Sequence, residues 1–148
     1  MMDVGYTNDH YVISRNPKVA SVNTATQIDL TGQVCADSIG QRILSGTGGQ
    51  LEFVRGAFLS EKGVSIIAIT SRAKNGASKI VPALDVASGV VTPRADVQWV
   101  VTEYGAVNLM GKSLQERAKL LISIAHPGDR ESLERVALER FGKGILNF

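Results

Sequence analysis

Aliphatic and β-branched residues gather in short segments between residues 19 and 102, separated by glycine, proline, asparagine and serine. Such segments are typical of β-strands. They predict strands at residues 19–22, 27–30, 50–54, 64–70, 79–84 and 97–102. Residues 66–69 and 99–101 are apolar at consecutive positions, which predicts central strands of a buried sheet, covered by helices on both faces.

The helical pattern comes later in the chain. One apolar stripe of helical period predicts a helix after Ser113, with its inward positions at Leu114, Ala118, Leu121, Ile122 and Ala125. Ser113 and Glu116 have the spacing of a capping box at its start, and Pro127 helps to end it. A second helix, ended by Gly142, is expected at about residues 130–140, with inward positions at Leu133, Val136 and Ala137.

The domain organisation is simple. Residues 1–17 are polar and show no sustained period, so we expect an irregular lead-in or connector. Residues 18–148 are interpreted as one domain, because 148 residues with 44% hydrophobic content suffice for a single core. No internal repeat or second domain boundary is visible.

Composition and charge exclude several classes of protein. The 16 basic and 14 acidic residues give a formal net charge of +2, too small to indicate a nucleic-acid or membrane partner. The longest apolar runs are too short to span a bilayer, and the amino terminus lacks the pattern of a signal peptide. Cys35 is the single cysteine, so no intrachain disulfide can form. We therefore expect a soluble, cytoplasmic protein.

Few side chains have the spacing of a catalytic or metal-binding motif. His10, Cys35 and His126 are scattered along the chain, so no metal site is expected, and the place of His126 before a proline favours a structural role. Glu103 stands out because it ends an apolar strand. A catalytic or ligand-orienting role and a structural role beside Tyr104 both stay open for it.

A glycine-rich loop covers residues 45–50 and contains Gly46, Gly48 and Gly49, followed by Gln50. Glycine suits a backbone that a ligand approaches closely, and successive free amides can bind an anion. Leu51 stands where a dinucleotide fingerprint needs glycine, and no P-loop lysine follows. Gly-Gly-Gln also occurs in translation release factors, but the weak basic charge disfavours that interpretation. A plain tight turn stays open.

A second loop, at residues 71–79, follows the predicted strand 64–70 and is therefore expected at the end of the sheet, where α/β proteins bind ligands. Its cations Arg72, Lys74 and Lys79, together with two serines and Gly76, suit phosphate oxygens. A solvated loop with ordinary lysines is the alternative.

Seven blocks of sequence follow one another at residues 21–34, 46–57, 73–76, 80–82, 100–105, 109–114 and 124–127. Together they resemble the C-terminal part of acetyl-CoA hydrolase/transferases, a family that includes 4-hydroxybutyrate CoA-transferases. Thr47, Glu52 and the run Lys74-Asn75-Gly76 depart from the family pattern. The resemblance implies an α/β fold with a layered, mainly parallel sheet flanked by helices, as in the CoA-transferase superfamily. It also implies that residues 18–148 form a domain incomplete at its N-terminal side.

The resemblance implies covalent catalysis. In the family, a glutamate carboxylate attacks an acyl-CoA thioester to give an acyl-glutamyl anhydride and CoA thiolate, which then form a glutamyl-CoA thioester. A second carboxylate collects the CoA in a transferase, and water replaces it as the acceptor in a hydrolase. No block of this chain matches the segment that carries the glutamate. We therefore expect the nucleophile outside this chain and no turnover by the chain alone.

The same resemblance implies a site, substrates and partners. In addition to Arg72, the implied oxyanion and CoA-binding residues are Gln33, Gly46, Gly48, Gly49, Gln50, Lys74, Gly76 and Lys79. The substrates are an acyl-CoA and a small carboxylate, with coenzyme A thioester as substrate and no permanently bound cofactor. The partner is a missing N-terminal half or partner subunit, within a homodimer. A noncatalytic acyl-CoA- or nucleotide-binding module is the alternative.

Overall fold

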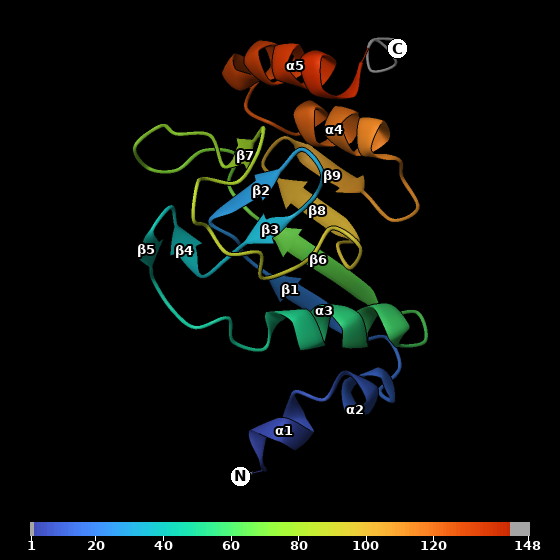
Figure 1. The fold of residues 1–148 in the computed structure, drawn as a ribbon. Helices are drawn as coiled ribbons and strands as arrows, with labels where there is room; N and C mark the ends of the chain where they lie inside the picture. The colour runs from blue at the N-terminus through green and yellow to red at the C-terminus, as the bar shows by residue number, and fades with distance from the viewer. Residues whose placement is uncertain (1, 143–148) are drawn as a thin grey trace.

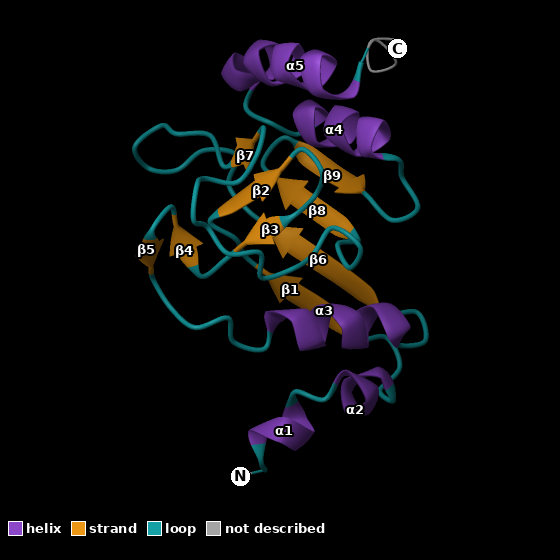
Figure 2. Cartoon of the chain, viewed as in Figure 1, coloured by secondary structure: helices purple, strands orange, loops and turns teal. Residues whose placement is uncertain are grey.

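The structure is a computed structural model that describes residues 2–142, with a four-stranded sheet at its centre (Figures 1 and 2). In spatial order, the strands are β1 (Ala20–Asn23), β6 (Val64–Ala68), β8 (Trp99–Thr102) and β9 (Gly105–Asn108). Strands β1, β6 and β8 are parallel, and β9 runs antiparallel to β8. A mainly parallel sheet with helices around it confirms the predicted α/β fold.

Two smaller sheets accompany the main one. In the first, β2 (Gln27–Asp29) pairs antiparallel with β3 (Val34–Cys35) and parallel with β7 (Ile80–Val81). In the second, β4 (Ser38–Ile39) and β5 (Arg42–Ile43) form an antiparallel pair. The sequence did not indicate β3, β4 or β5, because two-residue strands are too short to show a period.

Both predicted C-terminal helices are confirmed, as α4 (Leu114–Ser123) and α5 (Pro127–Phe141). Of the predicted inward positions, Leu114 is 40% exposed because it is the first residue of α4, and Ala125 is buried just beyond its end. The capping box is present, because the hydroxyl of Ser113 accepts from the amide of Glu116 at 3.3 Å and the Glu116 carboxylate accepts from the Ser113 amide at 2.8 Å. Helix α5 begins earlier than expected, with Pro127 in its first turn, where no amide hydrogen is required. Gly142 ends it with a positive φ of 80°.

The core lies against one face of the main sheet. Ile67, Val100 and Val107 point to this face and are 1%, 0% and 8% exposed. They belong to one buried cluster with Val54 of α3 (Gln50–Leu59) and Leu121 of α4. Burial of such aliphatic side chains is the main stabilising contribution, at about 1.5–3 kcal/mol for each.

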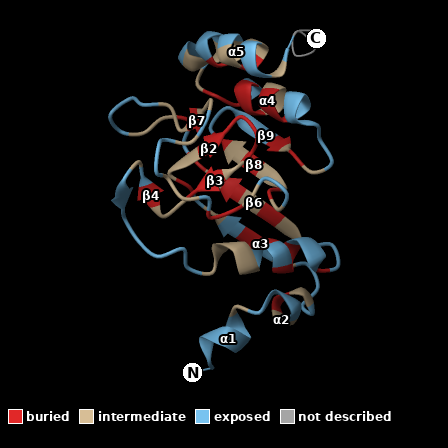
Figure 3. Ribbon diagram, viewed as in Figure 1, coloured by how far each residue is buried: buried red, intermediate tan, exposed pale blue. Residues whose placement is uncertain are grey.

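The opposite face of the sheet is only partly covered, so the prediction that helices cover the central strands on both faces is wrong. Val22 is 64% exposed, and Ile66, Trp99 and Val101 are only half-buried (Figure 3). Strands β6 and β8 are central in the strand order, as predicted. Residues 2–142 nevertheless bury only one face of these strands fully.

The strand predicted at residues 50–54 is wrong, because this segment forms the first half of α3. A five-residue window allowed either structure, whereas the longer run places Leu51, Val54 and Phe58 at helical spacing. Gly49 is the N-cap residue, and Ser60 follows the last turn.

The lead-in at residues 1–17 is also more regular than predicted. It contains two short helices, α1 (Val4–Thr7) and α2 (His10–Ser14), each preceded by an aspartate whose side chain caps it. The carboxylates of Asp3 and Asp9 accept from main-chain amides at 2.8 and 2.7 Å. Helix α2 buries Ile13 against Gly56 of α3. The aspartates were the sequence signal for both helices.

A buried arginine connects α4 to two loops. Arg117 is 7% exposed and donates to the main-chain carbonyls of Lys112 at 3.2 Å, Thr31 at 3.3 Å and Arg94. Burial lowers the pKa of this guanidinium. Carbonyl dipoles surround the charge, so its desolvation is offset by hydrogen bonds rather than by a carboxylate.

Gly56→Ala is expected to lower the free energy of unfolding by about 1–3 kcal/mol, as overpacking does. Alanine by itself favours helices over glycine by roughly 1 kcal/mol. At this position, however, a Cβ would lie 2.5 Å from Cγ2 of Ile13 and force α2 away from α3. Urea denaturation measures the difference. The matched control is Gly46→Ala, where a Cβ meets no atom within 4 Å. A more stable Gly56→Ala protein would contradict the tight contact.

Candidate functional site

The carboxyl ends of β1, β6 and β8 meet at one edge of the main sheet, and a cavity of about 390 Å³ lies there. Parallel sheets bind ligands at this edge. The residues that line the cavity are Thr24, Ala68, Ile69, Thr70, Lys79, Val101, Thr102 and Glu103. Sequence reasoning missed Thr24 and Thr70, although Thr24 lies shortly after the predicted strand 19–22 and Thr70 is the last residue of the predicted strand 64–70.

Lys79 lies between this cavity and a second one of about 450 Å³, and it lines both. Its Nζ donates to the carbonyl of Ala25 at 3.2 Å, which holds the ammonium near the shared wall. The second cavity is also lined by Asn75 and Asp85. The structure therefore places Lys79 where a cation can meet a ligand.

Lys74 and Gly76 lie at the exposed tip of the same loop. The loop turns back on itself, because the amide of Ala73 donates to the carbonyl of Ala77 at 2.8 Å. Gly76 has a positive φ of 85°, which glycine adopts without strain. Lys74 lines neither of the two cavities that Lys79 lines.

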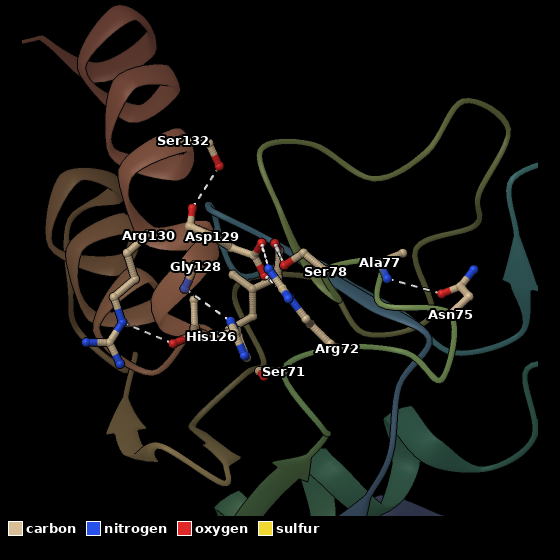
Figure 4. A network of polar contacts seen from close by, with 12 residues as sticks. Ser71, Arg72, Asn75, Ala77, Ser78, His126, Gly128, Asp129, Arg130 and Ser132 are labelled. Carbon is tan, nitrogen blue, oxygen red and sulfur yellow. Dashed lines mark hydrogen bonds and ion pairs between the residues drawn. The ribbon is translucent and has the colours of Figure 1, made fainter.

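Arg72 is engaged by a carboxylate, although its side chain is still 34% exposed (Figure 4). Its Nε donates to Oδ2 of Asp129 at 2.8 Å and its Nη2 to Oδ1 at 2.5 Å, a two-point ion pair with the first turn of α5. The pair lowers the pKa of Asp129, with smaller contributions from Ser78 and His126. His126 itself caps α5, since its Nδ1 accepts from the amide of Gly128 at 3.1 Å.

Glu103 is held by Ser71 through both carboxylate oxygens. Oε2 accepts from the amide of Ser71 at 2.9 Å, and Oε1 accepts from its hydroxyl at 2.6 Å. The hydroxyl bond is the largest cause that lowers the pKa of Glu103, followed by main-chain amides and the nearby His126. The carboxylate stays ionised and ties the end of β8 to the loop that follows β6.

The glycine-rich loop lies at the start of α3 and is exposed at Gly46 and Gly48. Gly48 has a positive φ of 60°, and no side chain caps the helix at Gly49. A Cβ at Gly49 would collide with the side-chain amide of Asn8. The Gln50 amide Nε2 donates to Oγ1 of Thr92 at 3.0 Å.

The two predicted loops line separate cavities within residues 2–142. The glycine-rich loop borders a cavity of about 230 Å³, and its wall is Thr47, Gly48, Leu51, Glu52, Val90 and Val91. No residue of that wall belongs to either cavity that Lys79 lines. Each loop therefore borders a cavity of its own.

Gln33 takes part in a buried turn. Its Nε2 donates to Asp29 at 3.1 Å, and Asp29 also accepts from the amide of Gln33 and from the amide and hydroxyl of Thr31. Asp29 is 2% exposed, so these bonds are shielded from water. The side-chain amide of Gln33 is thus occupied inside the chain.

Two features are absent from the part of the chain that the structure describes. Residues 2–142 contain no group of three or more His, Cys, Asp and Glu side chains arranged to hold a metal ion. The same residues include no helix with the length and apolarity needed to cross a bilayer.

Comparison with known proteins identifies the family. The family model of the acetyl-CoA hydrolase/transferase C-terminal domain matches residues 1–137. The chain belongs to this family. The resemblance inferred from the sequence blocks is thereby confirmed. The chain is 52% identical over 142 residues to the succinyl-CoA:acetate/propanoyl-CoA:succinate CoA transferase of Fasciola hepatica. The match covers 95% of this chain and 30% of that protein. The chain is 50% identical over 139 residues to the 4-hydroxybutyrate coenzyme A transferase of Clostridium kluyveri, covering 93% and 32%.

Solved structures agree with this family assignment. RipA from Yersinia pestis superposes with a TM-score of 0.86 at 45% identity, covering 93% of this chain and 31% of that chain. A 4-hydroxybutyrate CoA-transferase from Porphyromonas gingivalis gives a TM-score of 0.72 at 40% identity, covering 92% and 30%. The family domain described here thus spans about 30% of the length of these relatives.

The Arg72–Asp129 pair gives this family domain a specific dependence on pH. The folded state lowers the pKa of Asp129, so the pair stabilises the fold above the ordinary aspartate pKa of about 4. That stability is lost as the pH falls through the lowered pKa. Asp129→Asn should therefore be less stable at pH 7 and lose less further stability below about pH 4.

Urea denaturation at a series of pH values measures this difference. Glu131→Gln is the matched control, because it removes one negative charge from an exposed position of the same helix. It should parallel the wild type. Equal slopes for Asp129→Asn and the wild type below pH 4 would contradict the assigned role of the pair.

Proposed function

We propose that this chain supplies the C-terminal part of an enzyme that moves CoA between an acyl-CoA and a small carboxylate through a glutamyl-CoA intermediate. The nucleophilic glutamate comes from outside residues 1–148. The proposal rests on family membership and on the engagement of Glu103 by Ser71. It includes a homodimeric enzyme without a permanently bound cofactor, as the family resemblance implies, and a cytoplasmic location, as the composition of the sequence suggests.

The names of the relatives favour a carboxylate acceptor over water. Two relatives that are 52% and 50% identical to the chain are named CoA transferases. Relatives named acetyl-CoA hydrolases, from Kluyveromyces lactis and Saccharomyces cerevisiae, are 34% identical. Both groups act on CoA thioesters by name, which supports a CoA thioester as the substrate of this chain's enzyme.

The geometry of Glu103 argues against a nucleophilic role for it. Hydrogen bonds to the charged form stabilise a carboxylate and make it a weaker nucleophile. Both oxygens of Glu103 accept hydrogen bonds from Ser71, at 2.9 and 2.6 Å. The lowered pKa marks a carboxylate that is stabilised in its ground state and is therefore less reactive. Glu103 is better suited to shape the cavity edge.

The remaining predicted residues divide between two roles in this proposal. Lys79 offers a cation to the phosphates or the pantetheine arm of CoA. The more exposed Lys74 and Gly76 of the same loop contribute to the same part of the site. Uncapped amides at the start of α3, with the glycines of residues 46–49 and Gln50, offer donors to an oxyanion. Asp29 already engages the side-chain amide of Gln33, whereas no side chain caps the amides at the start of α3, so the glycine-rich loop is the better oxyanion donor.

Residues 1–148 alone are expected to transfer no CoA from acetyl-CoA to succinate, because the nucleophile lies elsewhere. Transfer should begin on mixing with the part of the Clostridium kluyveri enzyme that lies outside the matched region. Chromatographic detection of succinyl-CoA measures both reactions. Turnover by this chain alone that disappears in Glu103→Gln would sink the proposal and make Glu103 the nucleophile. Submicromolar CoA binding without transfer after mixing would favour the noncatalytic module.

Lys79→Gln is expected to raise the KM for acyl-CoA by about tenfold in the enzyme completed with that Clostridium kluyveri part. Loss of one charge-assisted contact has this order of effect. Steady-state kinetics with varied acyl-CoA measure it. Lys62→Gln is the control, because Lys62 is exposed in the turn before β6 and lines none of the three cavities described above. An unchanged KM in Lys79→Gln would remove Lys79 from the CoA site.

A further inference from the structure

One face of the main sheet is apolar and only partly covered. Strand register places Val22, Ile66 and Trp99 in one row across β1, β6 and β8, and Ala68, Val101 and Ala106 in the next. We call this surface the open face and define it by its apolar residues Ala20, Val22, Val64, Ile66, Ala68, Trp99, Val101 and Ala106. The polar Asn108 of β9 ends the first row.

Exposure separates the open face from its reverse. Val22 is 64% exposed, whereas Ile67 and Val100, which point the other way from the same sheet, are 1% and 0% exposed. In Figure 3 the colour of β6 and β8 alternates between buried and intermediate positions, and exposed positions appear on β1. Helix α3 contributes Val54 to the core on the buried side.

Physical chemistry requires an occupant for this surface. Parallel strands occur almost only in sheets whose two faces are both covered, because their crossovers place layers on each side. A contiguous apolar patch of this kind marks an interaction site. None of the eight residues that define the open face is charged, so they offer no cation to the phosphate of a lipid headgroup or a nucleic acid.

We infer that the open face docks the part of the same enzyme that lies outside residues 1–148; this rests on the proposed function. The relatives carry this domain as only 30–32% of a longer protein, so each provides more chain to cover the corresponding surface. The greater length of the relatives therefore favours the rest of the enzyme, and not a second copy of this chain, as the occupant of the open face.

The open face is continuous with the candidate site. Ala68 and Val101 belong to the open face and also line the cavity that contains Lys79 and Glu103. A segment that covers these two residues comes to lie over the mouth of the cavity. The docked part would therefore close the cavity that Lys79 lines as well as bury the sheet.

The test compares one substitution in two settings. In residues 1–148 alone, Val22→Lys should leave the thermal unfolding midpoint near that of the wild type, because Val22 is already exposed. In a fusion with the part of the Clostridium kluyveri 4-hydroxybutyrate coenzyme A transferase outside the matched region, it should lower the midpoint by several degrees. Val86→Lys, at a valine that is 87% exposed away from the sheet, should change neither protein.

Sedimentation adds a second readout that does not depend on catalysis. The separate Clostridium kluyveri part should bind wild-type residues 1–148 at least tenfold more tightly than it binds Val22→Lys. Equal midpoints and equal affinities for both variants would overturn the inference, as would a homodimer of residues 1–148 that Val22→Lys dissociates. Docking that Val22→Lys weakens, without any CoA transfer by the wild-type fusion, would support the open face and reject the proposed function instead.

Discussion

Parallel strands need a covering layer on each face, and this constraint governs the molecule. One face of β1, β6 and β8 is satisfied by α3, by α4 and by residues of the smaller sheet, which share one buried cluster. The other face presents Val22 and its neighbours to solvent. The structure is therefore a domain with a complete core on one side and an interaction surface on the other.

The same sheet positions the chemistry. Side chains that follow β1, β6 and β8 converge because parallel strands end at one edge. Most of the charged groups near that edge are already used to hold the loops. Glu103 fixes the loop after β6 through Ser71, and Arg72 fixes it to α5 through Asp129. Lys79 is left bordering two cavities, which makes it the cation best placed for a ligand.

The division between held and available groups explains why this domain suits a supporting role. Its ion pairs and hydrogen bonds shape a cavity edge but leave Glu103 poorly disposed for attack. A covalent mechanism then needs a carboxylate from another segment, and the open face beside the cavity is where such a segment can dock. Stability and catalysis would depend on the same contact surface.

The sequence by itself determined the family, the mainly parallel α/β fold and the two C-terminal helices. These follow from ordered motif blocks and from contacts between near neighbours, such as the capping box of Ser113 and Glu116. Only the tertiary structure decided which charges are free. Arg72 meets Asp129 across 57 positions and Glu103 meets Ser71 across 32, separations that no local period encodes. The tertiary structure also decided that the central strands are covered on one face only. The apolar pattern shows which residues favour burial, but it does not show which part of the protein covers them.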